Sequence, residues 1–303
     1  MSDDLSLGQE PTPIRCEGAT LPGVFYISRC KGADLVTRTR LAAAATRGCS
    51  CSTDHCCADS GSCDCCSYGD FAYDEDGRLR SVSSPPPIIE CGENCSCPST
   101  CRNRVVGHGV QQRLTVFRTS DERGWGVRCD EPLRRGTFVC EYAGEIISSI
   151  EATSRRHKRM RVADDGFRAD GGPMNYILSV LEHTGSGDVL KTTIDPTHRG
   201  NVGRYINHAC DPTLVPVLVR VGSLVPSVAL FCRRDIDAGE ELTFHYGDAN
   251  GDASSTSNEG ANAVKKHHSN TLLNKLESMA ARRDCRCGSA RCEGFLPFDP
   301  GAG

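Results

Sequence analysis

The distribution of cysteine is the feature that most constrains what this chain can fold into. Twenty of the 303 residues are cysteine, and most of them gather in segments 49–101 and 285–292. The first segment is poor in aliphatic residues and is interrupted by Pro85-Pro86-Pro87, so it cannot build a hydrophobic core and needs another kind of cross-link. The N-terminal sequence MSDDLSLGQEPTP does not resemble a secretory signal. We therefore expect reduced thiols that bind metal rather than disulfides.

The spacing in the first segment matches a cluster of three zinc ions. Zinc takes four ligands in a tetrahedron, so three ions need twelve bonds, which nine thiolates supply if three of them bridge two ions each. The doublets Cys56-Cys57 and Cys65-Cys66 leave a choice, and we favour Cys57 and Cys65, because Cys65 completes a Cys-x-Cys pair. Disulfides or redox cysteines are the alternative. The predicted ligands are Cys49, Cys51, Cys57, Cys63, Cys65, Cys91, Cys95, Cys97 and Cys101.

A second zinc site is predicted near the end of the chain. Cys285, Cys287 and Cys292 offer three ligands, whereas a closed structural site needs four. Cys210 is the best candidate for the fourth, and one zinc ion would then tie the tail to the middle of the chain. A local three-cysteine knot without metal is the alternative.

The remaining composition favours a protein with a cationic partner. The formal net charge is -4 and the pI is near 6.1, which argues against a protein that tracks nucleic-acid phosphates and suits one that attracts basic peptides. No apolar run reaches about 18 residues, so no membrane span and no membrane partner are expected.

The pattern of apolar residues predicts a mostly β domain with few helices. Helices are expected at Ser148–Val162, at Thr39–Thr46 and, after a Gly/Ser/Asn-rich linker, at Thr271–Arg282. The strands are expected at Leu114–Arg118, Gly136–Tyr142, Asn175–Val180, Leu214–Val221 and Val228–Arg233. The predicted division is an N-terminal segment (1–48), a zinc-cluster module (49–109), a mostly β domain (110–247), a flexible linker (248–280) and a zinc-bound tail (281–298).

Three motifs resemble signatures of one enzyme family. Arg204-Tyr205-Ile206-Asn207-His208-Ala209-Cys210, Glu241-Leu242-Thr243-Phe244-His245-Tyr246-Gly247 and Arg123-Gly124-Trp125-Gly126 are similar to motifs of SET-domain lysine methyltransferases. The two cysteine arrays are similar to the pre-SET and post-SET modules of the suppressor-of-variegation class, and residues 195–208 resemble its SETMAR branch. The resemblance implies the SET fold, in which small curved sheets surround a knot-like crossing of the chain near Asn207 and Tyr246.

The resemblance also implies the chemistry. Members transfer a methyl group from S-adenosylmethionine to a lysine amine. Tyr246 would be the catalytic tyrosine, Tyr176 a second wall of the lysine channel, and Phe244 its lining, although each aromatic ring taken alone is more often a core residue. The residues implied for the cofactor are Arg123, Gly124, Trp125, Gly126, Tyr176, Arg204, Asn207, His208, Phe295 and Leu296.

The implied partners are the histone H3 tail and the nucleosome, in the nucleus and on the chromosome, with the enzyme as a monomer. The class suggests lysine 9 as the target, the SETMAR-like stretch leaves lysine 36 as an alternative, and Phe244 suggests di- and trimethylated product. His245 departs from the aspartate that relatives often carry. The basic run Arg155–Arg161 is expected to be a solvated helix face, or else to contact nucleosomal DNA or a neighbouring acidic surface. A non-catalytic, zinc-stapled chromatin-binding module is the rival interpretation.

Overall fold

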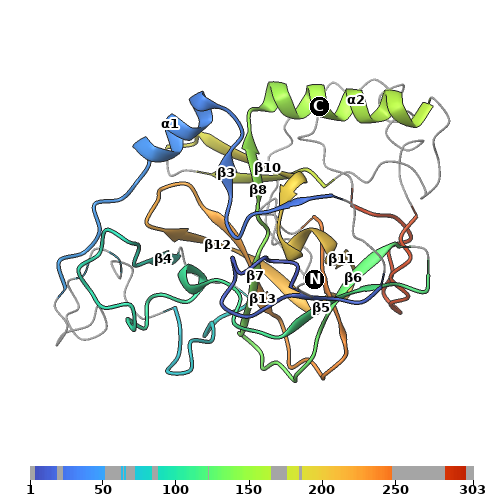
Figure 1. Cartoon of the computed structure of the whole chain (residues 1–303), viewed down its shortest axis with the longest axis horizontal. Helices are drawn as coiled ribbons and strands as arrows, with labels where there is room; N and C mark the ends of the chain where they lie inside the picture. Colours follow the sequence, from blue (N-terminus) through green and yellow to red (C-terminus); the bar gives the residue numbers. More distant parts are fainter. Residues whose placement is uncertain are drawn as a thin grey trace, which may run out of the picture.

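The computed structural model is built mainly of strands (Figure 1). The fold is therefore the mostly β architecture that the sequence predicts. The predicted linker, the predicted helix at Thr271–Arg282 and the cysteines Cys56, Cys57 and Cys66 lie outside the described residues. The structure describes residues 4–18, 23–51, 63, 65, 72–83, 88–121, 123–164, 176–183, 186–247 and 284–297.

A large sheet holds most of the catalytic-domain strands. In the described part of the chain it has nine strands, and its centre is filled by apolar side chains that include Leu114, Val127, Leu230 and Phe244. The strand path is β1 (Arg15–Cys16), β5 (Leu114–Arg118), β6 (Trp125–Cys129), β14 (Glu241–Phe244), β12 (Leu214–Val221), β13 (Ser227–Cys232) and β7 (Phe138–Glu141), with β11 (Asn207–His208) paired to β14 and β4 (Ile88–Glu90) paired to β12.

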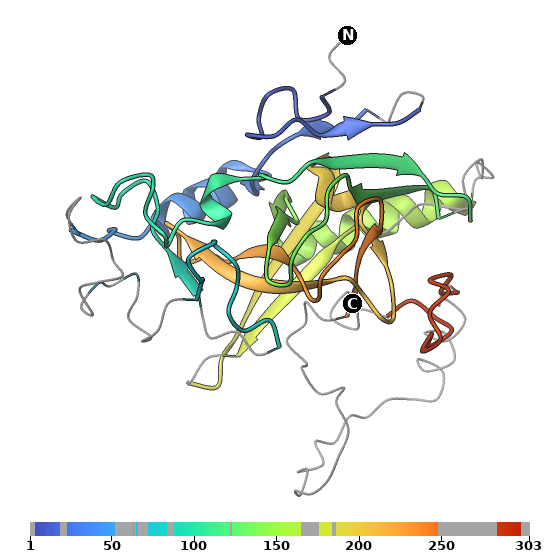
Figure 2. The same cartoon turned by 90° about the horizontal axis from the view of Figure 1, so that it is seen from below.

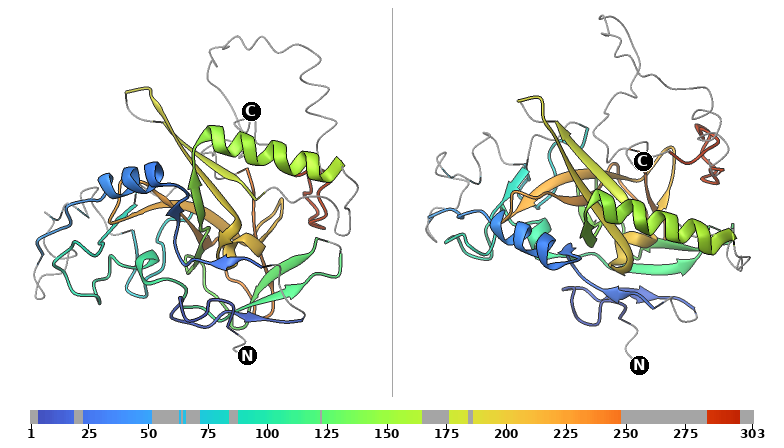
Figure 3. Two further views of the ribbon diagram at one scale, coloured as in Figure 1. Left: turned by 45° about the horizontal axis from the view of Figure 1, so that its top comes forward. Right: turned by 90° about the horizontal axis from the view of Figure 1, so that it is seen from above.

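A second sheet carries the two helices of the described chain. Figures 1 and 3 show α1 (Leu35–Ala43) and α2 (Ser149–Asp164) on the same side of the molecule. Two short 3-10 helices, η2 (Val106–His108) and η3 (Val202–Tyr205), connect strands. The strands of this sheet are β2 (Phe25–Tyr26), β10 (Val189–Gly200), β8 (Gly144–Ile147) and β3 (Lys31–Gly32), with β9 (Leu178–His183) paired to β10.

The pairing of β11 with β14 positions the candidate site. The two strands are parallel, with Asn207 opposite Thr243 and His208 opposite Phe244. This pairing places the segment around Asn207 directly beside the strand that precedes Tyr246, as the expected crossing of the chain requires. Figure 2 shows the N-terminal segment and the C-terminal tail on different sides of this arrangement.

Two predicted elements are displaced in the structure. The helix expected at Thr39–Thr46 begins earlier, at Leu35, because the side chain of Asp34 caps it by accepting a hydrogen bond from the Thr37 backbone N–H at 2.7 Å. The strand expected at Asn175–Val180 lies at Leu178–His183. By contrast, β5 and β12 have the predicted boundaries.

The basic run of α2 is only in part the solvated face that the sequence predicts, because His157 and Lys158 are exposed but other residues of the run are not. Arg155 and Arg159 turn inward and form ion pairs with the fully buried side chain of Asp195, at 3.0 and 2.8 Å. Arg155 also pairs with Glu145 at 2.8 Å. These contacts hold α2 against β8 and β10. No helix among the described residues has the length and apolar character needed to cross a membrane.

Candidate active site and metal sites

An aromatic cluster forms where β7 and β14 end. The Phe244 ring lies 4.9 Å from the Tyr246 ring and 5.8 Å, edge to face, from the Tyr142 ring (centroid distances). Phe244 is 1% exposed and Tyr142 is 6% exposed. The hydrophobic core thus continues into this cluster, which presents two phenol groups in a largely apolar setting.

Backbone carbonyls fix both phenol groups. The Tyr142 hydroxyl donates a hydrogen bond to the carbonyl oxygen of Tyr176 at 2.7 Å, and the Tyr246 hydroxyl donates to that of Ile206 at 3.1 Å. Burial raises the pKa of both Tyr142 and Tyr246 well above the ordinary tyrosine value. Both groups are therefore neutral at physiological pH and have fixed directions.

A buried arginine adjoins the cluster. Arg204 is 7% exposed, and its guanidinium carbon lies 4.3 Å from the centre of the Tyr176 ring and 4.8 Å from that of Tyr205. Its Nη1 donates to the Tyr205 hydroxyl at 3.1 Å. Its Nε is buried without a hydrogen-bond acceptor among the described residues. A buried cation held by aromatic faces suits an anionic group of a ligand.

The carboxylate of Glu241 joins the Arg123–Gly126 segment to β11. The Asn207 side-chain amide donates to the Trp125 carbonyl at 3.0 Å and to Glu241 Oε1 at 2.9 Å. Both terminal nitrogens of Arg123 bind Glu241, at 3.1 and 2.8 Å. A Cβ at Gly126 would lie 3.0 Å from Glu241 Oε1, so a larger residue there would push against this carboxylate. The loop and β11 are thus held together by charge-assisted hydrogen bonds.

His208 connects the aromatic cluster to the metal site of the tail. Its Nδ1 accepts a hydrogen bond from the Tyr246 backbone N–H at 3.3 Å, so the ring proton resides on Nε2. Nε2 lies 3.4 Å from Cys210 Sγ. The rings of His245 and Tyr246 flank His208 at 4.9 and 5.3 Å. His208 therefore orients the Cys210 sulfur and the Tyr246 backbone at once.

The tail brings four thiols together as the sequence predicts. The sulfur atoms of Cys210, Cys285, Cys287 and Cys292 all lie within 4.8 Å of one another, and those of Cys210 and Cys285 are 3.8 Å apart. In a tetrahedral site with Zn–S bonds of about 2.3 Å, neighbouring sulfurs are about 3.8 Å apart. The four thiols therefore fit one zinc ion.

The tail then passes beside the aromatic cluster. A Cβ at Gly247, the residue after Tyr246, would lie 3.4 Å from Pro297. Phe295 is 46% exposed and forms a bridge with Asp284, and Leu296 is half-buried. The metal site thus places the last described residues next to the turn that carries Tyr246.

The first cysteine array also gathers in the structure. Its eight described cysteines fall into three groups, and within each group the sulfurs lie within 4.8 Å of one another. Two sulfur–sulfur distances, Cys65 to Cys95 at 3.7 Å and Cys91 to Cys101 at 4.0 Å, are close to a tetrahedral edge. The groups are Cys49, Cys65, Cys91 and Cys95; Cys49, Cys51 and Cys63; and Cys91, Cys97 and Cys101.

Comparisons with known proteins identify the family. The SET domain model matches residues 124–247 and the Pre-SET motif matches residues 8–104. The chain is 38% identical over 256 residues to the histone-lysine N-methyltransferase SETMAR of Mus musculus, covering 83% of this chain and 74% of the relative. The chain belongs to the SET-domain histone-lysine methyltransferases. This family also includes Su(var)3-9, and membership confirms the resemblance seen in the motifs.

Solved structures of SET-domain proteins have the same fold. The methyltransferase domain of human SETMAR superposes with a TM-score of 0.73 at 32% identity, covering 99% of both chains. KRYPTONITE, solved with methylated DNA, an H3(1-15) peptide and S-adenosylhomocysteine, superposes with a TM-score of 0.69 at 25% identity, covering 98% of this chain and 54% of KRYPTONITE.

The sequence motifs do not predict a role for two residues, Tyr142 and Glu241, that adjoin the predicted site of this SET domain. Tyr142 stands one residue after β7, and only its packing on Phe244 reveals it. Glu241 opens the motif that contains Phe244 and Tyr246, but its partner Arg123 lies 118 residues away in the sequence. Of the other predicted residues, Phe244 and Tyr246 lie in the aromatic cluster, and Glu241 joins Arg123 to Asn207. The pre-SET cysteines gather in a separate array, and Cys57 lies outside the described residues.

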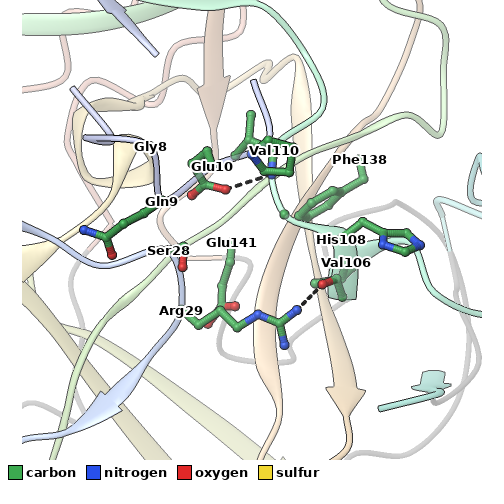
Figure 4. Close-up of a pocket in the computed structure, with 13 residues that line it drawn as sticks. Gly8, Gln9, Glu10, Ser28, Arg29, Val106, His108, Val110, Phe138 and Glu141 are labelled. Atoms are coloured by element: carbon green, nitrogen blue, oxygen red, sulfur yellow. Dashed lines mark hydrogen bonds between the residues drawn. The ribbon is translucent and has the colours of Figure 1, made fainter. Parts of the chain in front are cut away.

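A separate pocket of about 300 Å³ lies between the N-terminal segment and the loop that contains η2 (Figure 4). Its polar groups are engaged with one another. Glu10 accepts hydrogen bonds from the Tyr26 hydroxyl and the Val110 N–H, and Arg29 donates to the Gly107 carbonyl. None of the predicted site residues lines the pocket, and the hydrogen bonds of Glu10 and Arg29 join the N-terminal part of the chain to the η2 loop.

Proposed function

We propose that this chain transfers methyl groups from S-adenosylmethionine to a lysine of the histone H3 tail. The aromatic cluster of Tyr142, Phe244 and Tyr246 is the observation that carries the proposal. It adjoins Asn207 and His208, which the family signature implies in cofactor binding. Further support comes from family membership and from the H3 peptide and S-adenosylhomocysteine present in the KRYPTONITE structure.

The cluster suits the chemistry of a lysine nucleophile. Free lysine has a pKa of about 10.4 and must lose its proton before it can attack a methyl group. Buried aromatic walls disfavour the charged ammonium and lower that pKa. The Tyr246 hydroxyl, fixed by the Ile206 carbonyl, orients the neutral amine, with Tyr176 and Tyr142 as walls. S-adenosylmethionine supplies the methyl group on a positively charged sulfur.

The residues around the cluster fit the cofactor. Arg204 offers a buried cation and an unpaired Nε, which suit a carboxylate. Gly124 and Gly126 let the loop backbone approach a ligand closely. Asn207 and His208 offer backbone groups on β11, and Trp125 offers an aromatic surface. The residues proposed to hold the cofactor are Arg123, Gly124, Trp125, Gly126, Tyr176, Arg204, Asn207, His208, Phe295 and Leu296.

We propose four zinc ions, three in the pre-SET module and one in the tail. The three cysteine groups contain four, three and three sulfurs, with Cys49 and Cys91 each shared by two groups. Two of the twelve bonds are then left, and one further bridging thiolate supplies both. Cys57, with Cys56 as the alternative, is proposed for this position. Cys210, Cys285, Cys287 and Cys292 would hold the fourth ion.

Lysine 9 of H3 is the proposed target, and di- and trimethyl-lysine are the proposed products. The enzyme is proposed to act as a monomer on chromosomes in the nucleus. The H3(1-15) peptide of KRYPTONITE spans position 9 and excludes position 36. Mass spectrometry of nucleosomes with lysine 9 or lysine 36 replaced by arginine tests the target. Loss of methylation only in the lysine 36 variant would favour the alternative target. Absence of S-adenosylmethionine binding in calorimetry would favour the non-catalytic chromatin-binding module.

A further inference from the structure

A basic pocket of about 480 Å³ lies where β3, α1 and the end of β10 meet, apart from the cofactor and zinc residues. Three of its six lining residues are cations and none is acidic. Arg199 comes from β10, Lys31 from β3 and Arg38 from α1, so the three charges converge from separate elements. The lining residues are Cys30, Lys31, Gly32, Arg38, Leu41 and Arg199.

Among the described residues, no carboxylate is paired with any of the three cations. None of them forms an ion pair with an acidic residue in the part of the chain that the structure describes. Glu145, opposite Lys31 in the strand pairing, is engaged with Arg155. Asp34 is used as the cap of α1. Like charges gathered without a counter-ion repel one another, and a bound anion would relieve that repulsion.

Arg38 is held against the backbone of β3, and both Lys31 and Arg38 are exposed to solvent. Gly32 lies so close to α1 that a Cβ there would be 2.6 Å from the Arg38 backbone nitrogen. This contact seats α1 on β3, and Arg38 Nε donates to the Gly32 carbonyl at 3.1 Å. Arg199 is half-buried, and its Nε is buried without an acceptor among the described residues. A buried guanidinium N–H needs an acceptor, which an anion oxygen provides.

We propose that this pocket binds a phosphodiester group of a nucleic-acid backbone. Guanidinium and ammonium groups that line one pocket suit the oxygens of a phosphate. The choice of a phosphodiester rests on the proposed function, because a nucleosomal substrate presents DNA beside the histone tail. Because the net charge of the chain is -4, we expect this pocket to contact the DNA backbone at one place and not along a continuous run of phosphates. Nucleosome binding and H3-peptide methylation then depend on different surfaces of the chain.

The test measures binding of a labelled 15-base-pair DNA duplex to the full chain by fluorescence anisotropy at several salt concentrations. The variants are Lys31→Gln, Arg38→Gln and Arg199→Gln. Because the pocket is proposed to neutralise one phosphate, each variant should reduce the slope of log affinity against log salt by up to about 0.9. Arg135→Gln is the matched control and should keep the wild-type slope. Arg135 is an exposed cation in the turn before β7, and its side chain forms no ion pair with a described residue.

Competition with inorganic phosphate and with an acidic peptide separates the possible ligands. Displacement of DNA only at high phosphate concentration, with weakened binding in the three variants, supports the proposal. Equal slopes in wild type and variants overturn it. Tighter binding of the acidic peptide also overturns it, as does binding of inorganic phosphate by a chain that does not bind the duplex. Circular dichroism verifies that each variant is folded. The three variants should methylate a free H3 peptide at the wild-type rate. If the wild-type chain does not methylate this peptide, that result contradicts the proposed function and leaves the DNA-binding proposal to be decided by the slopes.

Discussion

The side chain of Glu241 accepts a hydrogen bond from the side-chain amide of Asn207, with 2.9 Å between Oε1 and Nδ2. The same carboxylate binds both terminal nitrogens of Arg123. β14, β11 and the Arg123–Gly126 loop therefore meet at one charged group. Because the loop and Asn207 are both proposed to contact S-adenosylmethionine, the shape of that pocket depends on a residue that need not contact the cofactor itself.

We predict that Glu241→Gln weakens S-adenosylmethionine binding. The amide removes the negative charge that pairs with Arg123 and cannot accept all the hydrogen bonds that now converge on the carboxylate. Hydrogen bonds to charged groups contribute about 1.5–3 kcal/mol, so the Kd should rise about 10- to 100-fold. Isothermal titration calorimetry measures it. Glu240→Gln is the control, because Glu240 pairs with Arg234 in the adjacent turn and should leave the Kd unchanged. Equal affinities in all three proteins would contradict the prediction.

The pH profile of methylation should rise from pH 7 to pH 10 without a falling limb due to Tyr246. Burial raises the pKa of Tyr246, so its hydroxyl keeps its proton over this range, whereas the substrate amine becomes increasingly neutral. Tyr246→Phe should lower kcat about 100-fold at every pH and keep the shape of the profile. Initial rates on an H3 peptide with saturating cofactor measure both effects. A limb that falls above pH 8 in wild type and disappears in the variant would show that Tyr246 ionises within the range.

We predict that Cys210→Ser releases the tail and removes one zinc ion. Cys210 is the only tail-site thiol outside residues 284–297, so its loss cuts the link between the tail and the main domain. Zinc content should fall from about four to about three ions, and methylation should be lost while the main domain stays folded. Elemental analysis and circular dichroism measure these outcomes. Cys16→Ser, a half-buried cysteine outside both metal sites, should retain all zinc. Normal activity and zinc content in Cys210→Ser would rule out the split site.

Chelation should unfold the pre-SET module before the SET domain. Among the buried residues of its cysteine array the contacts are mainly between thiols, so metal binding supplies most of its folding free energy. Proteolysis after chelator treatment should cut within residues 49–101 while segment 114–244 stays protected. Mass spectrometry of the fragments identifies the cuts. Wild-type protein with fewer than about two tightly bound zinc ions would contradict the three-ion cluster.

Local patterns in the sequence predict much of this fold, and long-range contacts account for what they miss. β5 and β12 are regular runs of β-forming residues, so their boundaries are predictable. The cysteine spacing likewise predicts which thiols gather. The inward direction of Arg155 depends on Asp195, 40 residues away, and no periodicity in the helix reveals it. The roles of Tyr142 and Glu241 arise in the same way, from partners that only the fold brings close.

The number of methyl groups added should depend on Phe244. Its ring is 1% exposed and lies between Tyr142 and Tyr246, so the space beside the proposed amine position is apolar. A hydroxyl added there would hold a water molecule in the volume that a methylated amine needs when it turns. Expelling that water without replacing its hydrogen bonds is unfavourable. Phe244→Tyr should therefore shift the product from di- and trimethyl-lysine toward monomethyl-lysine and leave the first transfer largely intact.

A time course of mono-, di- and trimethylated H3 peptide, resolved by mass spectrometry, measures this shift. Phe231→Tyr is the matched control, because Phe231 is fully buried in a different apolar cluster, against Tyr73 and Phe138. A hydroxyl forced into that cluster should lower stability, by about 1–3 kcal/mol, without changing the product ratio. If Phe244 only packs the core, its tyrosine variant should behave in the same way as the control. An altered ratio at position 244 together with an unaltered ratio at position 231 assigns product control to the aromatic cluster beside Tyr246.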